Sequence, residues 1–294
     1  MPFTGKIPVE RCRLPEMSLD MISDATYKQI VGIVYRNSRI NLGAERHNLV
    51  VGRLSKRCRE LRLQTFENYC QLLNSGSGKA ELTTLIDLIS TNHTHFFREE
   101  HHFDFVTKTI VPEFKANPHN AAETFRCWSA AASSGEEAYT LAITLDEYNR
   151  RSGRLSWRMQ ATDISTRVIE LAREGIYDTS KLRLPNPELH DIYFQKGIGD
   201  SEGLSRVRDA QRDKISFYQA NLFQETLPFR GGQHLIFCRN VMIYFDAASQ
   251  QSLVHKLFSH LLPGGYLIFG TSESLIGINH NLRSLGRSIY KREK

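Results

Sequence analysis

The segment that follows one predicted buried strand carries three side chains able to take part in chemistry. The apolar run at residues 234–237 predicts a strand of a parallel sheet, and Arg239, Asn240 and Tyr244 come soon after it. Ligands of open α/β sheets bind at the carboxyl ends of strands, so a guanidinium, an amide and a phenol there indicate a binding site. The alternative is that Tyr244 belongs to the core and Arg239 is a surface charge.

A second segment, residues 128–139, joins another predicted strand to a helix. Small residues come first and let the backbone pass close to a ligand, and Glu136 and Glu137 then begin the helix. Only one glycine is present, so the segment lacks the G-x-G-x-x-G pattern of a dinucleotide site. Acidic residues at a helix start would repel a phosphate, which favours a cationic or hydroxyl-rich ligand. A plain strand-to-helix turn is the alternative.

Asp163 stands where the second predicted strand ends. A carboxylate in this place commonly accepts hydrogen bonds from ribose hydroxyls. Asp163 or Ser165 could instead cap the helix that follows, and the two residues can divide these roles.

Residues 91–103 combine paired phenylalanines with many polar side chains. Their histidines suggest a metal, but His101 and His102 are adjacent and cannot face the same way on a helix. No carboxylate-rich partner motif exists elsewhere, so we predict no metal site. Arg98 is instead predicted to be a fixed cation for an anionic substrate group, because a guanidinium can hold a carboxylate through two parallel hydrogen bonds.

An alternation of strands and helices must position these segments. Strands are predicted at residues 125–131, 158–162, 215–219, 234–238, 266–269 and 288–291, and helices at residues 136–148, 166–174 and 247–262. This order predicts βαβ units with right-handed crossovers and a mostly parallel sheet. Residues 177–214 are polar and rich in glycine and proline, which indicates an inserted subdomain of short strands.

The part of the chain before this alternation is predicted to be helical and basic. Between about residues 20 and 88, Val50, Leu54, Cys58 and Leu61 form one apolar stripe at helical spacing. Residues 1–62 contain 12 Lys and Arg against 6 Asp and Glu, which accounts for the net charge of +6. The excess indicates a patch that faces an acidic partner, with a solvated helix face as the alternative.

Composition favours a soluble cytosolic protein. Apolar residues make up 40% of the 294 residues, but no run approaches the length of a membrane span. Residues 1–17 lack the apolar region of a signal peptide and are predicted to be a flexible tail. The five cysteines are scattered and form no C-x-x-C pair, which favours a reducing compartment and argues against a zinc site or disulfide framework.

Three blocks of this sequence are distinctive: T-N-x-T-x-F-F-R-E at 91–99, W-S-A-A-A-S-x-G-E-E at 128–137 and F-C-R-N-V-M-I-Y-F-D at 237–246. Together they resemble the CheR family of chemotaxis receptor glutamate O-methyltransferases, which use S-adenosylmethionine. The match extends over about residues 20–290. It implies an all-α domain at residues 18–88 that docks the receptor. It also implies an α/β, Rossmann-like class I methyltransferase domain at residues 89–294, with a small antiparallel β insert at about 177–214.

The same resemblance implies roles for single residues. Arg98 and Tyr244 match the residues beside the methyl-transfer site. Cofactor contacts are implied for Asn92, Thr94, Arg98, Glu137, Asp163, Asn221, Leu222, Arg239 and Asn240. The loop at residues 197–203 (Gly197 to Gly203) resembles the one with which some members dock a C-terminal peptide of the receptor. Ser165 stands where the family commonly has a second Asp, which leaves the ribose contact to Asp163.

The chemistry of this family agrees with the residue types present. A glutamate side chain has an unperturbed pKa of about 4.3, so at neutral pH it is already a nucleophile and needs no general base. The enzyme must then position the carboxylate and exclude water. We expect Phe96, Phe97 and Tyr244 to form the walls of the pocket, and Arg98 with the Tyr244 hydroxyl to orient the carboxylate.

The expected partners are the acidic cytoplasmic helices of chemoreceptors. We expect the basic helix to dock them through Arg53, Lys56, Arg57 and Arg59. The resemblance further implies S-adenosylmethionine as cofactor, S-adenosylhomocysteine as product and no metal. We expect a cytoplasmic monomer that is recruited to receptor arrays, without nucleic-acid binding or membrane insertion.

Two other functions compete with this interpretation. A nucleic-acid methyltransferase also combines a basic domain with a cofactor domain, but R-N-V-M at residues 239–242 replaces the N-P-P-Y-like tetrapeptide of amino-group methyltransferases. A non-catalytic adaptor would keep the fold and lose the cofactor site. It is disfavoured by four residues that remain in place: Arg98, Glu137, Asp163 and Tyr244.

Overall fold

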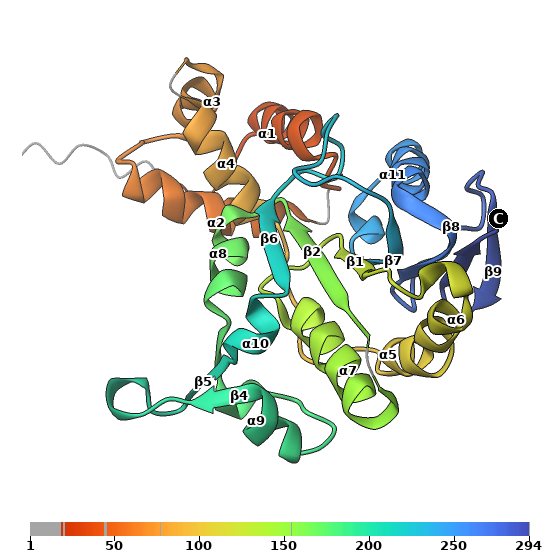
Figure 1. The fold of residues 1–294 in the computed structure, drawn as a ribbon. Coiled ribbons are helices and arrows are strands. Elements are labelled where there is room, and N and C mark those ends of the chain that lie inside the picture. Colours follow the sequence, from red (N-terminus) through yellow and green to blue (C-terminus); the bar gives the residue numbers. More distant parts are fainter. Residues whose placement is uncertain (1–18, 20, 44–45, 77, 154, 294) are drawn as a thin grey trace, which may run out of the picture.

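The computed structural model describes residues 19, 21–43, 46–76, 78–153 and 155–293. It shows N-terminal helices packed beside an α/β region, from which a small separate sheet extends (Figure 1). The predicted flexible tail, residues 1–17, lies outside the described residues. No helix in the described part of the chain is both long enough and apolar enough to cross a lipid bilayer.

The N-terminal region consists, in its described part, of four helices. They are α1 (Asp24–Ser38), α2 (His47–Glu60), α3 (Phe66–Asn74) and α4 (Gly78–Ile89). Ser23 and Thr65 begin α1 and α3, because their side-chain oxygens accept backbone N–H groups of the first turn.

The helical region packs against the segment that carries Tyr244. Val50, Leu54 and Cys58 of the predicted stripe are fully buried among the four helices. The Tyr244 ring packs against the same cluster, and the backbone N–H of Asn41 donates to the Tyr244 carbonyl oxygen at 2.8 Å. The helices therefore form one side of the surroundings of Tyr244.

The α/β region is built, over the described residues, on a seven-stranded sheet. In spatial order its strands are β6 (Ile215–Gln219), β2 (Trp157–Asp163), β1 (Phe125–Ser129), β7 (Gln233–Cys238), β8 (Leu261–Phe269), β10 (Ile289–Arg292) and β9 (Leu282–Gly286). The first five are parallel to one another, and β10 pairs antiparallel with both of its neighbours, β8 and β9. The predicted Rossmann-like sheet is confirmed. After β1 the chain adds β2 and β6 on one side of β1, and it then returns to add β7 and β8 on the other side. This reversal of strand order opens a crevice between β1 and β7.

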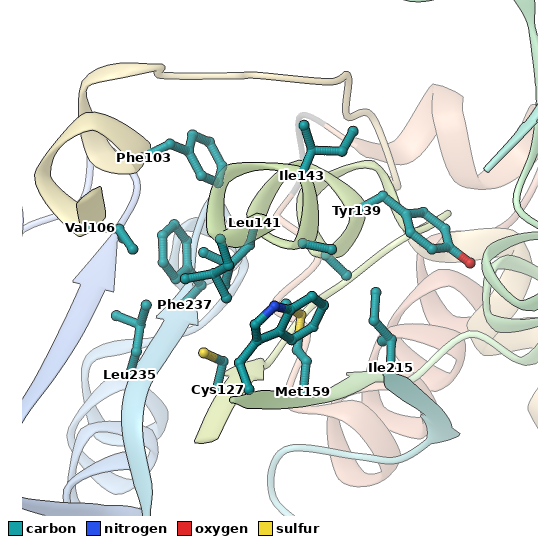
Figure 2. Close-up of a cluster of buried hydrophobic side chains, with 14 of the residues drawn as sticks. Phe103, Val106, Cys127, Tyr139, Leu141, Ile143, Met159, Ile215, Leu235 and Phe237 are labelled. Atoms are coloured by element: carbon teal, nitrogen blue, oxygen red, sulfur yellow. The ribbon is translucent and has the colours of Figure 1, made fainter. Parts of the chain in front are cut away.

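Helices cover both faces of this sheet. One face carries α7 (Glu136–Ser152), α5 (His101–Phe105) and α6 (Val111–Ala116), and the other carries α11 (Ala247–His260). Strand side chains alternate between the faces. Cys127, Leu235 and Phe237 pack beneath α7 (Figure 2), whereas Trp128 and Ile236 pack with α11. Two apolar layers thus fix the strand ends that bear the polar residues.

The insert forms a second sheet, in the order β3 (Ile176–Asp178), β5 (Leu204–Val207) and β4 (Phe194–Lys196), accompanied by α9 (Glu188–Tyr193). Both pairings are antiparallel, as expected. It extends away from the main sheet and follows α8 (Thr166–Glu174) (Figure 1). The loop at residues 197–203 joins β4 to β5, and its Ile198 is 86% exposed.

The structure differs from the predicted elements in three places. The chain forms α5, a π-helical turn (Val106–Ile110) and α6 where no helix is predicted. The last long helix ends at His260, and β8 already begins at Leu261, because Pro263 to Gly265 form an irregular stretch inside the strand and do not precede it. The edge strand β9 is missed because only its first residue is buried, which leaves no alternating apolar signal.

Candidate active site

A cleft opens at the carboxyl ends of β1 and β7, where the strand order reverses. It encloses about 990 Å³, part of it open to solvent, and the N-terminal helices contribute to its lining. All the residues predicted for cofactor binding and methyl transfer line it: Asn92, Thr94, Arg98, Glu137, Asp163, Asn221, Leu222, Arg239, Asn240 and Tyr244. They come from five separate segments of the chain, which the sheet brings to one place.

Asp163 lies at the end of β2 with its carboxylate buried in the cleft. Its Oδ2 accepts the backbone N–H of Ser133 at 2.9 Å, and its Oδ1 accepts that of Ser165 at 3.0 Å. Burial raises the pKa of Asp163 to about 6, against the opposing effect of these N–H groups. Ser165 caps α8 through its own hydroxyl, so this part of the predicted division of roles is confirmed, whereas the ribose contact of Asp163 stays a prediction.

The turn after β1 brings the backbone to the edge of the cleft. Ala130 and Ala131 line the cleft, and Ser133 and Gly135 have positive φ angles of 49° and 98°. A Cβ at Gly135 would lie 2.9 Å from the hydroxyl oxygen of Tyr177, so a glycine is required there. Small side chains and a left-handed turn leave the space in front of β1 open.

Arg239 connects two carboxylates at the floor of the cleft. Its side chain is 2% exposed and forms ion pairs with Glu99 (3.0 Å) and Glu137 (3.1 Å). Burial alone would raise the pKa of Glu99, but Arg239 and the Thr271 N–H lower it to about 2. Burial raises the pKa of Glu137, partly offset by Arg239. The Arg239 guanidinium therefore compensates the two carboxylates in a buried place, where ionising a carboxylate without a cation would cost free energy.

Arg98 and Tyr244 both line the cleft and are partly exposed. In the described structure the Arg98 guanidinium makes one hydrogen bond, to the carbonyl oxygen of His93 at 3.0 Å, which leaves most of its donors unused. The Tyr244 hydroxyl donates to the carbonyl oxygen of Thr91 at 3.4 Å. The Arg46 guanidinium lies over the Tyr244 ring, 4.9 Å from its centroid. This part of the site is cationic and has spare hydrogen-bond donors.

Comparisons with known proteins give the family. The sequence model for the CheR methyltransferase SAM-binding domain matches residues 92–291, and that for the CheR methyltransferase all-alpha domain matches residues 25–90. The chain belongs to the CheR methyltransferase family. It is therefore an S-adenosylmethionine-dependent methyltransferase of the chemotaxis type.

Curated relatives of this CheR-family chain match it nearly end to end. The chemotaxis protein methyltransferase of Salmonella typhimurium is 37% identical over 274 residues, which cover 93% of this chain and 92% of that protein. The protein of the same name from Borreliella burgdorferi is 38% identical over 267 residues, 90% of this chain and 93% of its own. Among solved structures, the magnesium protoporphyrin IX methyltransferase of Synechocystis PCC 6803 covers 72% of this chain and 68% of its own, with 14% identity and a TM-score of 0.34.

The polar groups in the cleft suit the cofactor of the CheR family. The Asn92 Oδ1 and the Arg239 Nε are buried and have no hydrogen-bond partner among the described residues. Buried polar groups are nearly always paired, so an unused acceptor and an unused donor indicate a ligand. The cofactor has a methionine part that carries an ammonium group and a carboxylate. The Asn92 Oδ1 suits the ammonium group as an acceptor, and the Arg239 Nε suits the carboxylate as a donor. Asp163 retains acceptor capacity for hydroxyl groups, and Leu222, Phe223 and other apolar side chains supply a surface for a base.

The four predicted docking residues do not lie in the cleft, and they differ in their surroundings. Arg53 donates from one guanidinium nitrogen to the carbonyl oxygens of residues 88, 89 and 90, at 2.6, 3.1 and 3.0 Å. Arg57 pairs with Glu81 through two hydrogen bonds of 2.9 and 2.7 Å. Lys56 and Arg59 are exposed on α2. The first two arginines hold α2 against α4, whereas the docking role of all four stays a prediction.

The expectation that Phe96 and Phe97 form pocket walls is wrong. Phe96 is 2% exposed and packs edge-on against Tyr177 and Phe194 of the insert. Its ring therefore packs the segment at residues 91–99 against the insert. Neither side chain lines the cleft; Phe103 does. The aromatic surface near β7 therefore comes from a helix that the sequence pattern did not predict.

Two acidic residues of the site were not singled out from the sequence. Glu99 pairs with Arg239, and Glu273, 4% exposed, accepts backbone hydrogen bonds from the turn after β7. Glu99 ends the block T-N-x-T-x-F-F-R-E, so its position beside Arg98 was a usable signal. Glu273 follows the end of β8, and the rule that ligands bind at strand ends could have drawn attention to it.

Proposed function

We propose that this protein transfers the methyl group of S-adenosylmethionine to the side-chain carboxylates of specific glutamates in chemoreceptor cytoplasmic helices. The products are glutamate methyl esters and S-adenosylhomocysteine, and the reaction serves adaptation in chemotaxis. One observation carries the proposal: a single cleft is lined both by acceptors suited to the cofactor and by Arg98 and Tyr244, which can bind a carboxylate. The names of the curated relatives support the chemotaxis assignment.

The proposed role of Arg98 follows from its unused donors. A guanidinium with one hydrogen bond in place can still hold a carboxylate through two parallel bonds. The long 3.4 Å bond of the Tyr244 hydroxyl is weak and can be exchanged for a bond to the substrate. Together these two groups orient an incoming glutamate. Binding the substrate carboxylate too strongly would stabilise the ground state, so the placement of Arg98 and Tyr244 matters more than the strength of their bonds to it.

The chemistry needs positioning more than proton transfer. When bound, S-adenosylmethionine supplies a methyl group on a positively charged sulfur. The substrate carboxylate is ionised at neutral pH, so no residue of the chain has to remove a proton. Correct placement of the reacting groups can supply roughly 7 to 11 kcal/mol of barrier reduction. The chain contributes Arg98 and Tyr244 for orientation, and Phe103 and Phe245 for the apolar lining that limits water.

We propose the following division of labour. The helical domain, residues 18–88, docks acidic receptor helices through the basic face of α2, on which Lys56 and Arg59 are exposed. The domain at residues 89–294 carries out methyl transfer, and its insert at about 177–214 receives a receptor peptide at the exposed loop 197–203. The protein acts in the cytoplasm as a monomer, recruited to membrane-bound receptor arrays and without a nucleic-acid partner.

Methyl transfer to receptor-containing membranes tests the proposal. With tritiated S-adenosylmethionine, label is expected in the receptor and is expected to leave as methanol after mild base. A receptor in which the methylated glutamates are replaced by alanine serves as the control and should stay unlabelled. Base-stable label would indicate methylated nitrogen and would reject carboxyl methylation. Calorimetry with S-adenosylhomocysteine separately tests the adaptor alternative, which predicts no binding.

A further inference from the structure

The side chain of Glu273 joins the turn after β7 to the turn after β8. Its Oε2 accepts the backbone N–H groups of Gly270 and Asn240, each at 2.7 Å. Its Oε1 accepts the N–H of Met242 at 2.8 Å. One carboxylate thus accepts hydrogen bonds from three backbone N–H groups of two turns, and Glu273 is 4% exposed.

This carboxylate has no cationic partner within ion-pairing distance in the described part of the chain. Burial raises the pKa of Glu273, and only hydrogen bonds from backbone N–H groups oppose the shift. Burying a carboxylate without a cation is costly, and an apolar side chain could fill the same space. Because the buried carboxylate costs free energy, we infer that the backbone positions it fixes, at Asn240, Met242 and Gly270, matter for the function of the protein.

The turn that Glu273 holds has an unusual backbone. Asn240 has a φ angle of 58°, in the left-handed region, which a residue with a side chain adopts at some cost. The approach of the two turns is close: a Cβ at Gly270 would lie 2.4 Å from Asn240 Nδ2 and 2.9 Å from Glu273 Oε2. A short 3-10 helix, Met242–Tyr244, then begins at a residue whose N–H is fixed by the carboxylate.

Both ends of this turn face the cleft. Asn240 lines it directly, and Tyr244 lines it from the end of the 3-10 helix. The backbone conformation between them decides where the amide and the phenol lie. Because Glu273 is the side chain that bonds to both Asn240 and Met242, a change in it shifts the two cleft residues together.

We propose that Glu273 is a positioning residue for methyl transfer, which fixes the turn from Arg239 to Tyr244 and so places Asn240 and Tyr244. This inference rests on the proposed function for its turnover readout. Glu273 itself does not line the cleft, so it acts only through the residues it holds.

The Glu273→Gln variant is the main test. An amide keeps one acceptor oxygen, and its NH₂ group must face at least one of the three N–H donors, so the turn opens on one side. Turnover is expected to fall about 10- to 100-fold, because a displacement of the reacting groups by about 1 Å can cost about 100-fold in rate. Glu174→Gln is the matched control, because Glu174 is exposed at the end of α8 and does not line the cleft. It should keep wild-type turnover.

Coupling to Tyr244 separates positioning from a merely structural role. If Glu273 acts through Tyr244, Glu273→Gln lowers turnover much less in a Tyr244→Phe background than in the wild type. Strictly additive losses would overturn the proposal. So would wild-type turnover and affinity in a Glu273→Gln protein that only melts earlier.

Two further measurements keep the test decisive. If Glu273→Gln does not fold, Gly270→Ala retains the glutamate but forces Asn240 and the Glu273 carboxylate away from the new Cβ. Wild-type turnover in that variant would reject the proposal. S-adenosylhomocysteine affinity reports the Asn240 end of the turn and is expected to fall at least threefold in Glu273→Gln. If the wild type gives no base-labile esters, the proposed function fails, yet this affinity still decides whether Glu273 positions the site.

Discussion

Replacing Asp163 with asparagine probes the cofactor side of the cleft. Each carboxylate oxygen already accepts one backbone N–H, from Ser133 at 2.9 Å and from Ser165 at 3.0 Å, and its remaining acceptor capacity is left for a ligand. An amide has one acceptor oxygen. The expected loss is one hydrogen bond between a charged group and a ribose hydroxyl, about 1.5–3 kcal/mol. This weakens the binding of S-adenosylhomocysteine by about 10- to 150-fold.

The effect of Asp163→Asn on folding stability should be much smaller. Burial raises the pKa of Asp163 from 3.8 to about 6. Between these two values the unfolded chain loses its proton first, so the contribution of this group to stability falls as the pH rises. Above pH 6 the ionised side chain costs about 3 kcal/mol relative to pH below 3.8. Asparagine removes this cost but leaves one buried N–H unpaired, at about 1–3 kcal/mol, so the two changes largely offset each other.

Calorimetry with S-adenosylhomocysteine from pH 5 to 8 measures the prediction. Ribose hydroxyls that donate to Asp163 favour its ionised form, so the wild-type affinity should drop below about pH 6, by up to about tenfold per pH unit. In Asp163→Asn the affinity should be low and this drop should disappear. Asp104→Asn, an exposed position outside the cleft, is the control and should behave as the wild type. Equal affinity in Asp163→Asn and wild type at pH 7.5 would refute the assignment of Asp163 to the cofactor.

Three other substitutions separate the remaining parts of the site. Arg98→Ala should lower turnover about 100-fold and leave S-adenosylhomocysteine affinity within about threefold, since its unused donors serve the substrate; calorimetric loss of cofactor affinity without a turnover defect would contradict this. Arg239→Met should lower the free energy of unfolding by about 3–5 kcal/mol, because two buried carboxylates lose their cation; urea denaturation that shows less than about 1 kcal/mol would reject the argument. Charge reversal of Lys56 and Arg59 should raise the KM for receptor about 3- to 10-fold at low salt and less at high salt. An unchanged KM at both salt concentrations would remove this helix face from docking.

The location of the cleft follows from the sequence because its residues stand directly after strands. A run of buried apolar residues can be recognised locally, and so can the polar residue that ends it, as at Asp163 or Arg239. Parallel strands then place these ends at one edge without any further information. The family resemblance added residues such as Asn92, which has no strand signal of its own.

Contacts between distant segments could not be predicted in this way. Glu273 is 33 residues from Asn240, and nothing local distinguishes it from a surface acid. The same limit affects Arg53, which the charge count assigns to the basic docking face. The structure shows its guanidinium on three carbonyl oxygens at the end of α4, a role that depends on tertiary packing. A count of charges along a helix cannot separate such a residue from an exposed neighbour like Lys56.

The charges of the cleft fall into two parts with different consequences. At the floor, Arg239 compensates Glu99 and Glu137, so these three groups stabilise one another and fix the turns around them. Asp163 has no such cation among the residues that the structure describes and accepts backbone N–H groups alone, so its burial makes ionisation costly. A fold selected only for stability would replace that carboxylate with a neutral side chain. Its presence, like the unused donors of Arg98, is explained if the missing partners arrive with the ligand and the substrate.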